Sequence, residues 1–216
     1  MPDYTKGEEI FNMVTHIVGG AIGIATLVFC ILIPAFRGSV SGVLCGIVFG
    51  VSMIALYTMS SVYHGLRPNT AKKVFQIIDH CTIYFLIAGT YTPILVCNMA
   101  SSYPIEAWVT FGVVWGLAAL ATTLTAIDLS KYKVFSMICY VGMGWAVIFS
   151  IKKAFECLGA YGFGLVLAGG ILYTLGILFY KLGKDKRYFH SIFHIFVLLG
   201  SICHSAAVMF FVLWKV

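Results

Sequence analysis

The sequence has few charged residues and few long polar stretches. Only 10% of its 216 residues are charged and 61% are apolar, against about 25% and roughly 45–50% in soluble domains. This composition excludes a soluble globular protein. The apolar runs are long and unbroken, without the apolar–polar alternation of membrane β-strands, so a membrane β-barrel is disfavoured too. We therefore expect an all-α membrane protein.

Paired cysteine motifs, basic stripes and a signal peptide are also missing. The seven cysteines show no CxxC spacing and mostly lie in apolar runs, so we interpret them as small buried hydrophobic residues. The net charge of +6 comes from basic residues scattered among the connections, which argues against a nucleic-acid partner. The acidic start of the chain carries no cleavage pattern and predicts no removable signal peptide.

Polar residues divide the chain into seven apolar spans, each close to the roughly 20 residues that a bilayer requires. The spans cover residues 16–35, 40–63, 77–98, 105–126, 133–151, 160–180 and 189–214. No linker or repeat separates them, so the sequence predicts one domain over residues 1–216. We expect a seven-transmembrane helix bundle whose termini lie on opposite sides of the membrane.

The distribution of lysine and arginine predicts the orientation of this bundle. Ten basic residues fall on the side of the N-terminus: Lys6, Arg67, Lys72, Lys73, Lys131, Lys133, Lys181, Lys184, Lys186 and Arg187. Four fall on the other side: Arg37, Lys152, Lys153 and Lys215. Because cytoplasmic loops carry the excess of positive charge, we expect the N-terminus in the cytoplasm and the C-terminus outside.

Glycines recur at every fourth residue on two of the spans, a spacing that lets helix backbones approach closely. They are Gly42, Gly46 and Gly50 in the second span and Gly112 and Gly116 in the fourth. We expect both sets to pack against neighbouring helices.

Polar residues collect at the cytoplasmic ends of three spans. Ionisable residues inside a membrane are costly, so each is a functional candidate by default. The second span ends with Ser60 and His64, the third begins near Asp79, and the seventh begins with His190 and His194. Side chains four residues apart share a helix face. We expect these five side chains to lie together at one depth.

This set of residue types indicates a zinc site. His64, His190 and His194 would supply three neutral nitrogen ligands and leave the fourth tetrahedral position to water, as in catalytic zinc sites. Asp79 would accept a hydrogen bond and then a proton from that water, and Ser60 would hold Asp79 or a substrate oxygen. The competing interpretation is a set of interfacial histidines that reach out to water.

Two further histidines lie near this set in the sequence. His204 comes ten residues after His194, about 15 Å along the helix, so it cannot bind the same ion. We expect it to make a structural hydrogen bond, with a place on a substrate or proton path as the alternative. His16 is expected in a structural role at the membrane interface, with a role beside the site as the alternative.

Three motifs stand out together: Ser60-x-x-x-His64, Asp79 opening a helix that continues to Gly89-Thr-Tyr-Thr-Pro93, and His190-Ser-Ile-Phe-His194 followed by His204. Over essentially its whole length the chain resembles the bacterial haemolysin III family, part of the progestin and adipoQ receptor superfamily that includes the adiponectin receptors. This superfamily is also similar to the alkaline ceramidases, which are membrane zinc amidases.

The resemblance implies seven spans with the N-terminus inside, in the bacterial cytoplasmic (inner) membrane. It implies zinc bound by His64, His190 and His194, with Asp79 contacting the zinc-bound water and Ser60 beside it.

Several functions remain open at this stage. The first hypothesis is a zinc-dependent intramembrane hydrolase that acts on a lipid amide or ester and contributes to membrane lipid homeostasis. The alternative is a non-catalytic sensor of membrane lipids whose zinc is structural. The family name suggests lysis of host membranes, and histidines from two spans could instead ligate haem. Membrane lipids are the expected partners in the first two cases, and the lipid and the oligomeric state stay open.

Overall fold

The computed structural model describes residues 4–183 and 186–216, so Lys184 of the basic residues counted above lies outside the described residues. The described residues form helices and contain no strand. The elements are α1 (Lys6–Ala35), α2 (Val40–Gly65), α3 (Thr70–Pro93), the π-helix η1 (Ile94–Met99), α4 (Pro104–Ile127), α5 (Lys133–Gly144), the 3₁₀-helix η2 (Ala146–Ser150), α6 (Ile151–Leu182), α7 (Phe189–Ala207), the π-helix η3 (Val208–Val212) and the 3₁₀-helix η4 (Leu213–Lys215). The predicted all-α class is confirmed.

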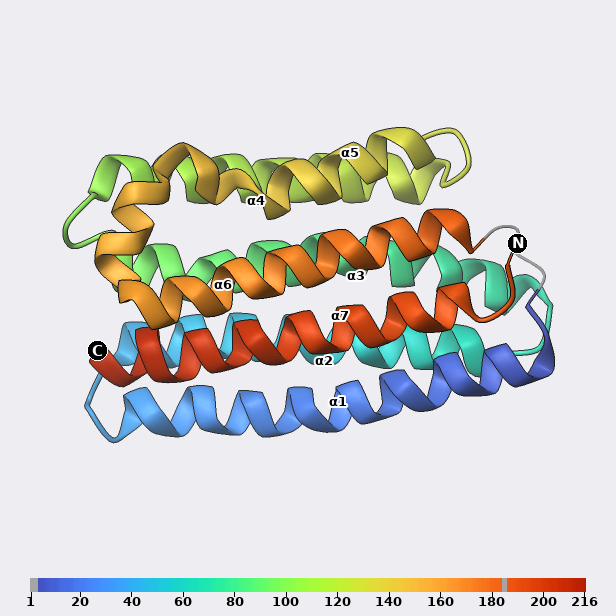
Figure 1. Ribbon diagram of the computed structural model, residues 1–216, viewed down its shortest axis with the longest axis horizontal. Helices are drawn as coiled ribbons and strands as arrows, with labels where there is room; N and C mark the ends of the chain where they lie inside the picture. The colour runs from blue at the N-terminus through green and yellow to red at the C-terminus, as the bar shows by residue number, and fades with distance from the viewer. Residues whose placement is uncertain (1–3, 184–185) are drawn as a thin grey trace.

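The helices form an elongated bundle (Figure 1). In that view α4 and α5 lie along one side, α1, α2 and α7 lie along the opposite side, and α3 and α6 run between them. The starts of α1 and α7 and the α2–α3 connection gather at one end. The α1–α2 connection and the C-terminus lie at the other end.

Capping extends the helices beyond the apolar runs that predicted them. Thr5 and Glu8 form a capping box at the start of α1: the Glu8 carboxylate accepts the Thr5 N–H at 2.9 Å and the Thr5 hydroxyl accepts the Glu8 N–H at 3.3 Å. Asn69 caps α3 by accepting the Lys72 N–H at 2.8 Å. Caps satisfy backbone N–H groups that a helix end leaves unpaired. Both helices therefore begin well before the predicted residues 16 and 77, and they carry charged residues to this end of the bundle.

The glycines of α2 bring its backbone against that of α1. A Cβ atom on Gly46 would lie 2.2 Å from the carbonyl oxygen of Cys30, and one on Gly50 would lie 2.7 Å from the Cα atom of Leu27. Real Cβ atoms do not approach so closely, so only glycine fits at these two positions. The predicted close packing of this glycine set is confirmed.

The same prediction is wrong for the glycines of α4. A Cβ atom on Gly112 or Gly116 would meet no atom of the described residues within 4 Å. α4 turns another face inward, on which Ala107, Val114 and Ala118 are buried. The four-residue spacing of glycines shows that one face of a helix lacks side chains. Whether that face packs against a neighbouring helix depends on the packing of the whole bundle.

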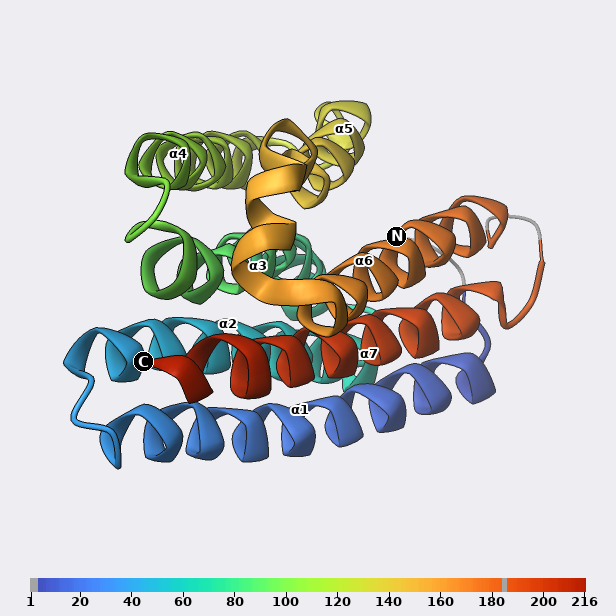
Figure 2. The same cartoon turned by 60° about the vertical axis from the view of Figure 1, so that its left-hand side comes forward.

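Six helical stretches in the described chain are long and apolar enough to cross a membrane, where the sequence predicts seven spans. The difference lies in Lys133–Leu182, a stretch of 50 residues that takes in the predicted spans 133–151 and 160–180. This stretch is not straight, because η2 interrupts it and Gly159 has φ 74° and ψ 172°, outside the helical region. Figure 2 shows the chain turning sharply between α5 and the long part of α6. With these helices, the chain is a multi-pass membrane protein.

Candidate metal centre

The three histidines predicted as metal ligands lie together at one end of the bundle. α2 supplies His64 from its last turn, and α7 supplies His190 and His194 from its first turns. One ring nitrogen of each lies within 4.8 Å of the other two, and the Nε2 atoms of His190 and His194 are 3.0 Å apart. His64 and His194 are only 3% and 2% exposed. This histidine group could hold a metal ion.

The chemistry of the group fits such an ion. Ligand nitrogens about 2 Å from a tetrahedral ion lie about 3.4 Å from one another, which compares with 3.0 Å between the Nε2 atoms of His190 and His194 and falls within the 4.8 Å that encloses all three residues' ligand atoms. The Nε2 atom of His64 is buried and has no hydrogen-bond partner among the described residues. A buried unpaired polar atom costs about 1–3 kcal/mol. A metal ion would use the lone pair of this nitrogen and remove that cost.

A carboxylate and an ammonium group stand behind His64. The Nδ1 atom of His64 lies 2.6 Å from Oε2 of Glu9, on α1. The other carboxylate oxygen of Glu9 accepts a hydrogen bond from Nζ of Lys72 at 2.6 Å, and the same ammonium donates to the carbonyl of Leu66 at 2.9 Å. Lys72 is 3% exposed, so this ion pair is largely shielded from solvent.

Contacts one helical turn apart join α1 to the start of α7. The Glu8 carboxylate accepts the N–H of Tyr188 at 2.6 Å, the Ser191 hydroxyl donates to Oδ1 of Asn12 at 2.7 Å, and the ring of His16 stacks on that of His194 with centroids 3.7 Å apart. Tyr188 has a φ of 62°, which is strained for a residue other than glycine. The Glu8 contact therefore holds a strained turn directly before the two histidines of α7.

His16 accordingly lies beside the histidine group, buried among helices. It is 3% exposed and stacks on a candidate ligand. This position agrees with the alternative expectation, a role beside the site; capping starts α1 well before residue 16 and so places His16 more than two turns inside the helix.

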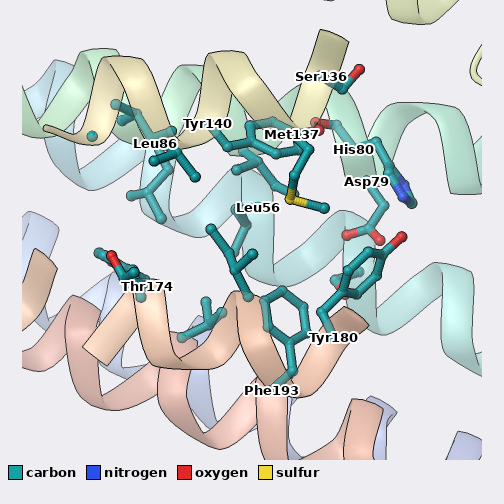
Figure 3. Close-up of a pocket in the computed structure, with 18 of the residues that line it drawn as sticks. Leu56, Asp79, His80, Leu86, Ser136, Met137, Tyr140, Thr174, Tyr180 and Phe193 are labelled. Atoms are coloured by element: carbon teal, nitrogen blue, oxygen red, sulfur yellow. Dashed lines mark hydrogen bonds between the residues drawn. The ribbon is translucent and has the colours of Figure 1, made fainter. Parts of the chain in front are cut away.

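Asp79 and Ser60 line a cavity beside this group. The cavity has a volume of about 160 Å³ and is also lined by His190 and His194. The hydroxyl of Ser60 is a neighbour of the carboxylate of Asp79. Figure 3 shows Asp79 on α3 and Tyr180 on α6 lining this space from opposite sides. The structure thus brings all five predicted residues to one end of the bundle.

The cavity continues from the histidine group toward the middle of the bundle. Mostly apolar side chains line it, such as Leu56, Leu86, Met137 and Phe193 (Figure 3). His204 lines its far part, about 15 Å along α7 from His194. The Nε2 atom of His204 lies 3.0 Å from the carbonyl oxygen of Val166, so His204 makes the structural hydrogen bond that the sequence predicts.

Tyr4 covers the histidine group from the end of the bundle. Its ring stacks on that of His190 with centroids 4.8 Å apart and lies 5.8 Å from that of His64. Burial raises the pKa of the Tyr4 hydroxyl, and the nearby hydroxyls of Tyr63 and Tyr180 raise it further. The Tyr4 hydroxyl is therefore a neutral group beside the histidines.

Sequence reasoning missed Glu9, Lys72 and Tyr4. Glu9 and Tyr4 belong to none of the three motifs, and Lys72 enters the sequence prediction only as a charge that sets orientation. One signal was available: a histidine ligand usually donates its second N–H to a carboxylate or a carbonyl. A search for such an acceptor would have added Glu8 and Glu9, which precede the first apolar run at the same end, to Asp79.

The sequence matches known proteins over nearly the whole chain. A family model described as "Haemolysin-III related" matches residues 4–205. The chain belongs to this haemolysin-III-related family. The resemblance read from the three sequence motifs is confirmed, and the match takes in the five residues predicted for the site.

Individual relatives of this haemolysin-III-related protein extend from bacteria to animals. "Hemolysin-3" of Bacillus cereus is 38% identical over 213 residues, 99% of this chain and 95% of the relative. "Hemolysin-3 homolog" of Bacillus subtilis is 36% identical over 208 residues, 96% of each chain. More distantly, "Monocyte to macrophage differentiation factor" of Homo sapiens is 28% identical over 176 residues, 78% of this chain and 68% of the relative. "Adiponectin receptor protein" of Drosophila melanogaster is 23% identical over 228 residues, 96% of this chain and 51% of the receptor.

Proposed function

We propose that this haemolysin-III-related protein is a zinc-dependent hydrolase of the bacterial cytoplasmic membrane that cleaves an amide or ester bond of a lipid. One observation carries the proposal: two members of the three-histidine group, His190 and His194, line a largely apolar cavity that Asp79 and Ser60 also line. Candidate metal ligands, a candidate base and an apolar space for an acyl chain thus meet in one place.

His64, His190 and His194 would hold the ion. Three neutral nitrogens with an open fourth position are a ligand set of catalytic zinc sites. When bound, zinc would lower the pKa of water toward neutrality and polarise the carbonyl of a lipid.

Asp79 is the candidate general base. Glu9 is engaged by His64 and Lys72, and Glu8 is engaged by the N–H groups of Thr5 and Tyr188. Asp79 lines the cavity with the hydroxyl of Ser60 beside it. It would take a proton from a water molecule in the cavity, while the Ser60 hydroxyl would hold the carboxylate in one orientation.

The cavity would bind the acyl part of the substrate. It reaches from the histidine group to His204, a distance of about 15 Å along α7. Its apolar lining would replace water around an extended chain and leave the carbonyl at the histidine end. Substrate would enter from the membrane itself, so membrane lipids are the partners proposed for this protein.

We also propose that the chain crosses the membrane seven times, with the N-terminus and the histidine group on the cytoplasmic side. A straight helix of the 50 residues in Lys133–Leu182 would be about 75 Å long. That is more than twice the hydrocarbon thickness of about 30 Å. The break at Gly159 and the turn at η2 support two crossings within this stretch. The excess of basic residues at the histidine end supports the orientation.

The test compares zinc content and lipid turnover in the same preparations. Removing a general base typically slows a reaction about 10²–10⁴-fold, so Asp79→Asn should keep its zinc and lose hydrolysis of membrane lipids by about that factor. Asp128→Asn is the matched control, because Asp128 lies at the same end and accepts hydrogen bonds only from its own turn. Lipid analysis of cells that contain the wild type or either variant would identify the substrate and product.

An unchanged lipid profile across these strains, with zinc present in all, would refute the hydrolase proposal. The zinc would then be structural, and the protein would act by binding lipid alone.

A further inference from the structure

We infer that Glu9 is a positioning residue that fixes the ring of His64 for metal binding, and that Lys72 holds Glu9 in place. The inference deepens the zinc function proposed above and rests on it. It arises from one juxtaposition: the Glu9 carboxylate bridges the ring of His64 and the ammonium of Lys72, with both distances at 2.6 Å. Three helices meet through this carboxylate, since α1 carries Glu9, α2 carries His64 and α3 carries Lys72.

The contact selects one tautomer of His64. An ionised carboxylate can only accept hydrogen bonds, so the Nδ1 atom of His64 must carry the hydrogen that it shares with Glu9. In a neutral imidazole the lone pair then lies on Nε2. This is the nitrogen that is buried without a partner, so it is the one available to an ion held together with His190 and His194. Glu9 therefore presents to the metal position the nitrogen that can bind.

Lys72 binds the second oxygen of the Glu9 carboxylate. Its Nζ atom donates to Oε1 of Glu9 at 2.6 Å and to the Leu66 carbonyl at 2.9 Å. Each oxygen of Glu9 thus has its own partner, and the carboxylate cannot turn without breaking a charge-assisted hydrogen bond. The Lys72 charge also balances that of Glu9, so His64 can remain neutral as a ligand. A carboxylate behind a histidine ligand raises the basicity of the ring and fixes its orientation.

The same contacts tie three helices together, so the experiment must separate positioning from a purely structural role. Full-length protein is purified in detergent, stripped of metal and titrated with Zn²⁺ in competition with a chromophoric chelator. Thermal unfolding of the metal-free protein is measured alongside. A structural tie alone would change the unfolding temperature, and it would leave the zinc affinity of the folded protein as it is.

Glu9→Ala should lower zinc affinity about 10–100-fold, the effect typical of losing such an outer partner. Glu9→Gln should lower it less, because the amide oxygen still accepts the Nδ1 hydrogen but carries no charge. Glu106→Gln is the matched control, since Glu106 also pairs with a lysine, Lys153, at the opposite end of the bundle. The zinc affinity of Glu106→Gln should equal that of the wild type. With Co²⁺ at saturation, the visible absorption of Glu9→Ala should differ from that of the wild type because the His64 ring is free to turn.

Equal zinc affinity and equal Co²⁺ spectra in Glu9→Ala and the wild type would overturn the inference and leave the proposed function standing. Absence of zinc binding by the wild type would overturn both. Should Glu9→Ala fail to fold, Glu9→Gln and Lys72→Met give the same comparison: affinity below the wild type in both supports positioning, and wild-type affinity in both refutes it.

Discussion

Replacing Gly46 by alanine should separate the two helices that carry much of the histidine site. The added Cβ atom would lie 2.2 Å from the carbonyl oxygen of Cys30 and 2.9 Å from its carbonyl carbon. These are backbone atoms of α1, so no side chain can move aside and the helices must shift apart by about 1 Å. Overpacking typically costs about 1–3 kcal/mol, and because the clash is with backbone atoms the cost here should lie in the upper part of that range, about 2–3 kcal/mol. Alanine returns about 1 kcal/mol through its higher helix propensity, which leaves a net loss of about 1–2 kcal/mol.

Gly112→Ala is the matched control, with the opposite expected sign. No described atom lies within 4 Å of its added Cβ, so only the gain in helix propensity of about 0.5–1 kcal/mol remains. In a protein of this size 1 kcal/mol shifts the melting temperature by about 2–4 °C. Thermal unfolding in detergent should therefore show Gly46→Ala lower by about 2–8 °C and Gly112→Ala higher by up to about 4 °C. An unchanged melting temperature in Gly46→Ala would refute the close contact of α1 and α2, and a lower one in Gly112→Ala would show that the open face of α4 packs against another molecule.

Two further predictions concern the metal ligands and the topology. His194→Ala should lose most of the bound zinc, because two histidines cannot complete the coordination shell, whereas His204→Ala should keep it. Elemental analysis of the purified variants measures the zinc content. Full zinc in His194→Ala would show that His194 is not a ligand. Cysteines placed in the 67–73 connection should be protected from a membrane-impermeant thiol reagent in intact cells, while a cysteine at Val216 should be labelled, in a background whose native cysteines are replaced. The reverse pattern would place the histidine site on the outer side.

The predictable part of the site is the part encoded by local spacing. His190 and His194 share a helix face whatever the rest of the chain does, and the ends of the apolar runs set the depth of His64 and Asp79. Glu9 lies before the first apolar run, in a segment that hydropathy alone treats as a flank. Its role depends on the capping box that extends α1 and on the angle at which α1 packs against α2, and both are tertiary outcomes.

The fold shows the same division between local and tertiary information. Gly46 and Gly112 carry the same sequence signal, yet only Gly46 contacts another helix. The apolar runs 133–151 and 160–180 predict two spans, while the structure joins them through η2 and a kink at Gly159 into one long stretch. Run length and spacing define the helices and their possible faces. Which face is buried, and how two runs are joined, follows from packing.

The candidate ligands come from the second helix and the last, which has a consequence for how the protein is made. A chain is synthesised from its N-terminus, so Glu9 and His64 enter the membrane while α7 is still missing. Until α7 arrives there is one histidine where three are needed, and metal has no site to fill. The metal ion would then bind only after α7 has joined the bundle, so the free energy of metal binding would stabilise only complete chains. Chains stalled during translation would lack both the metal and the stability that it adds.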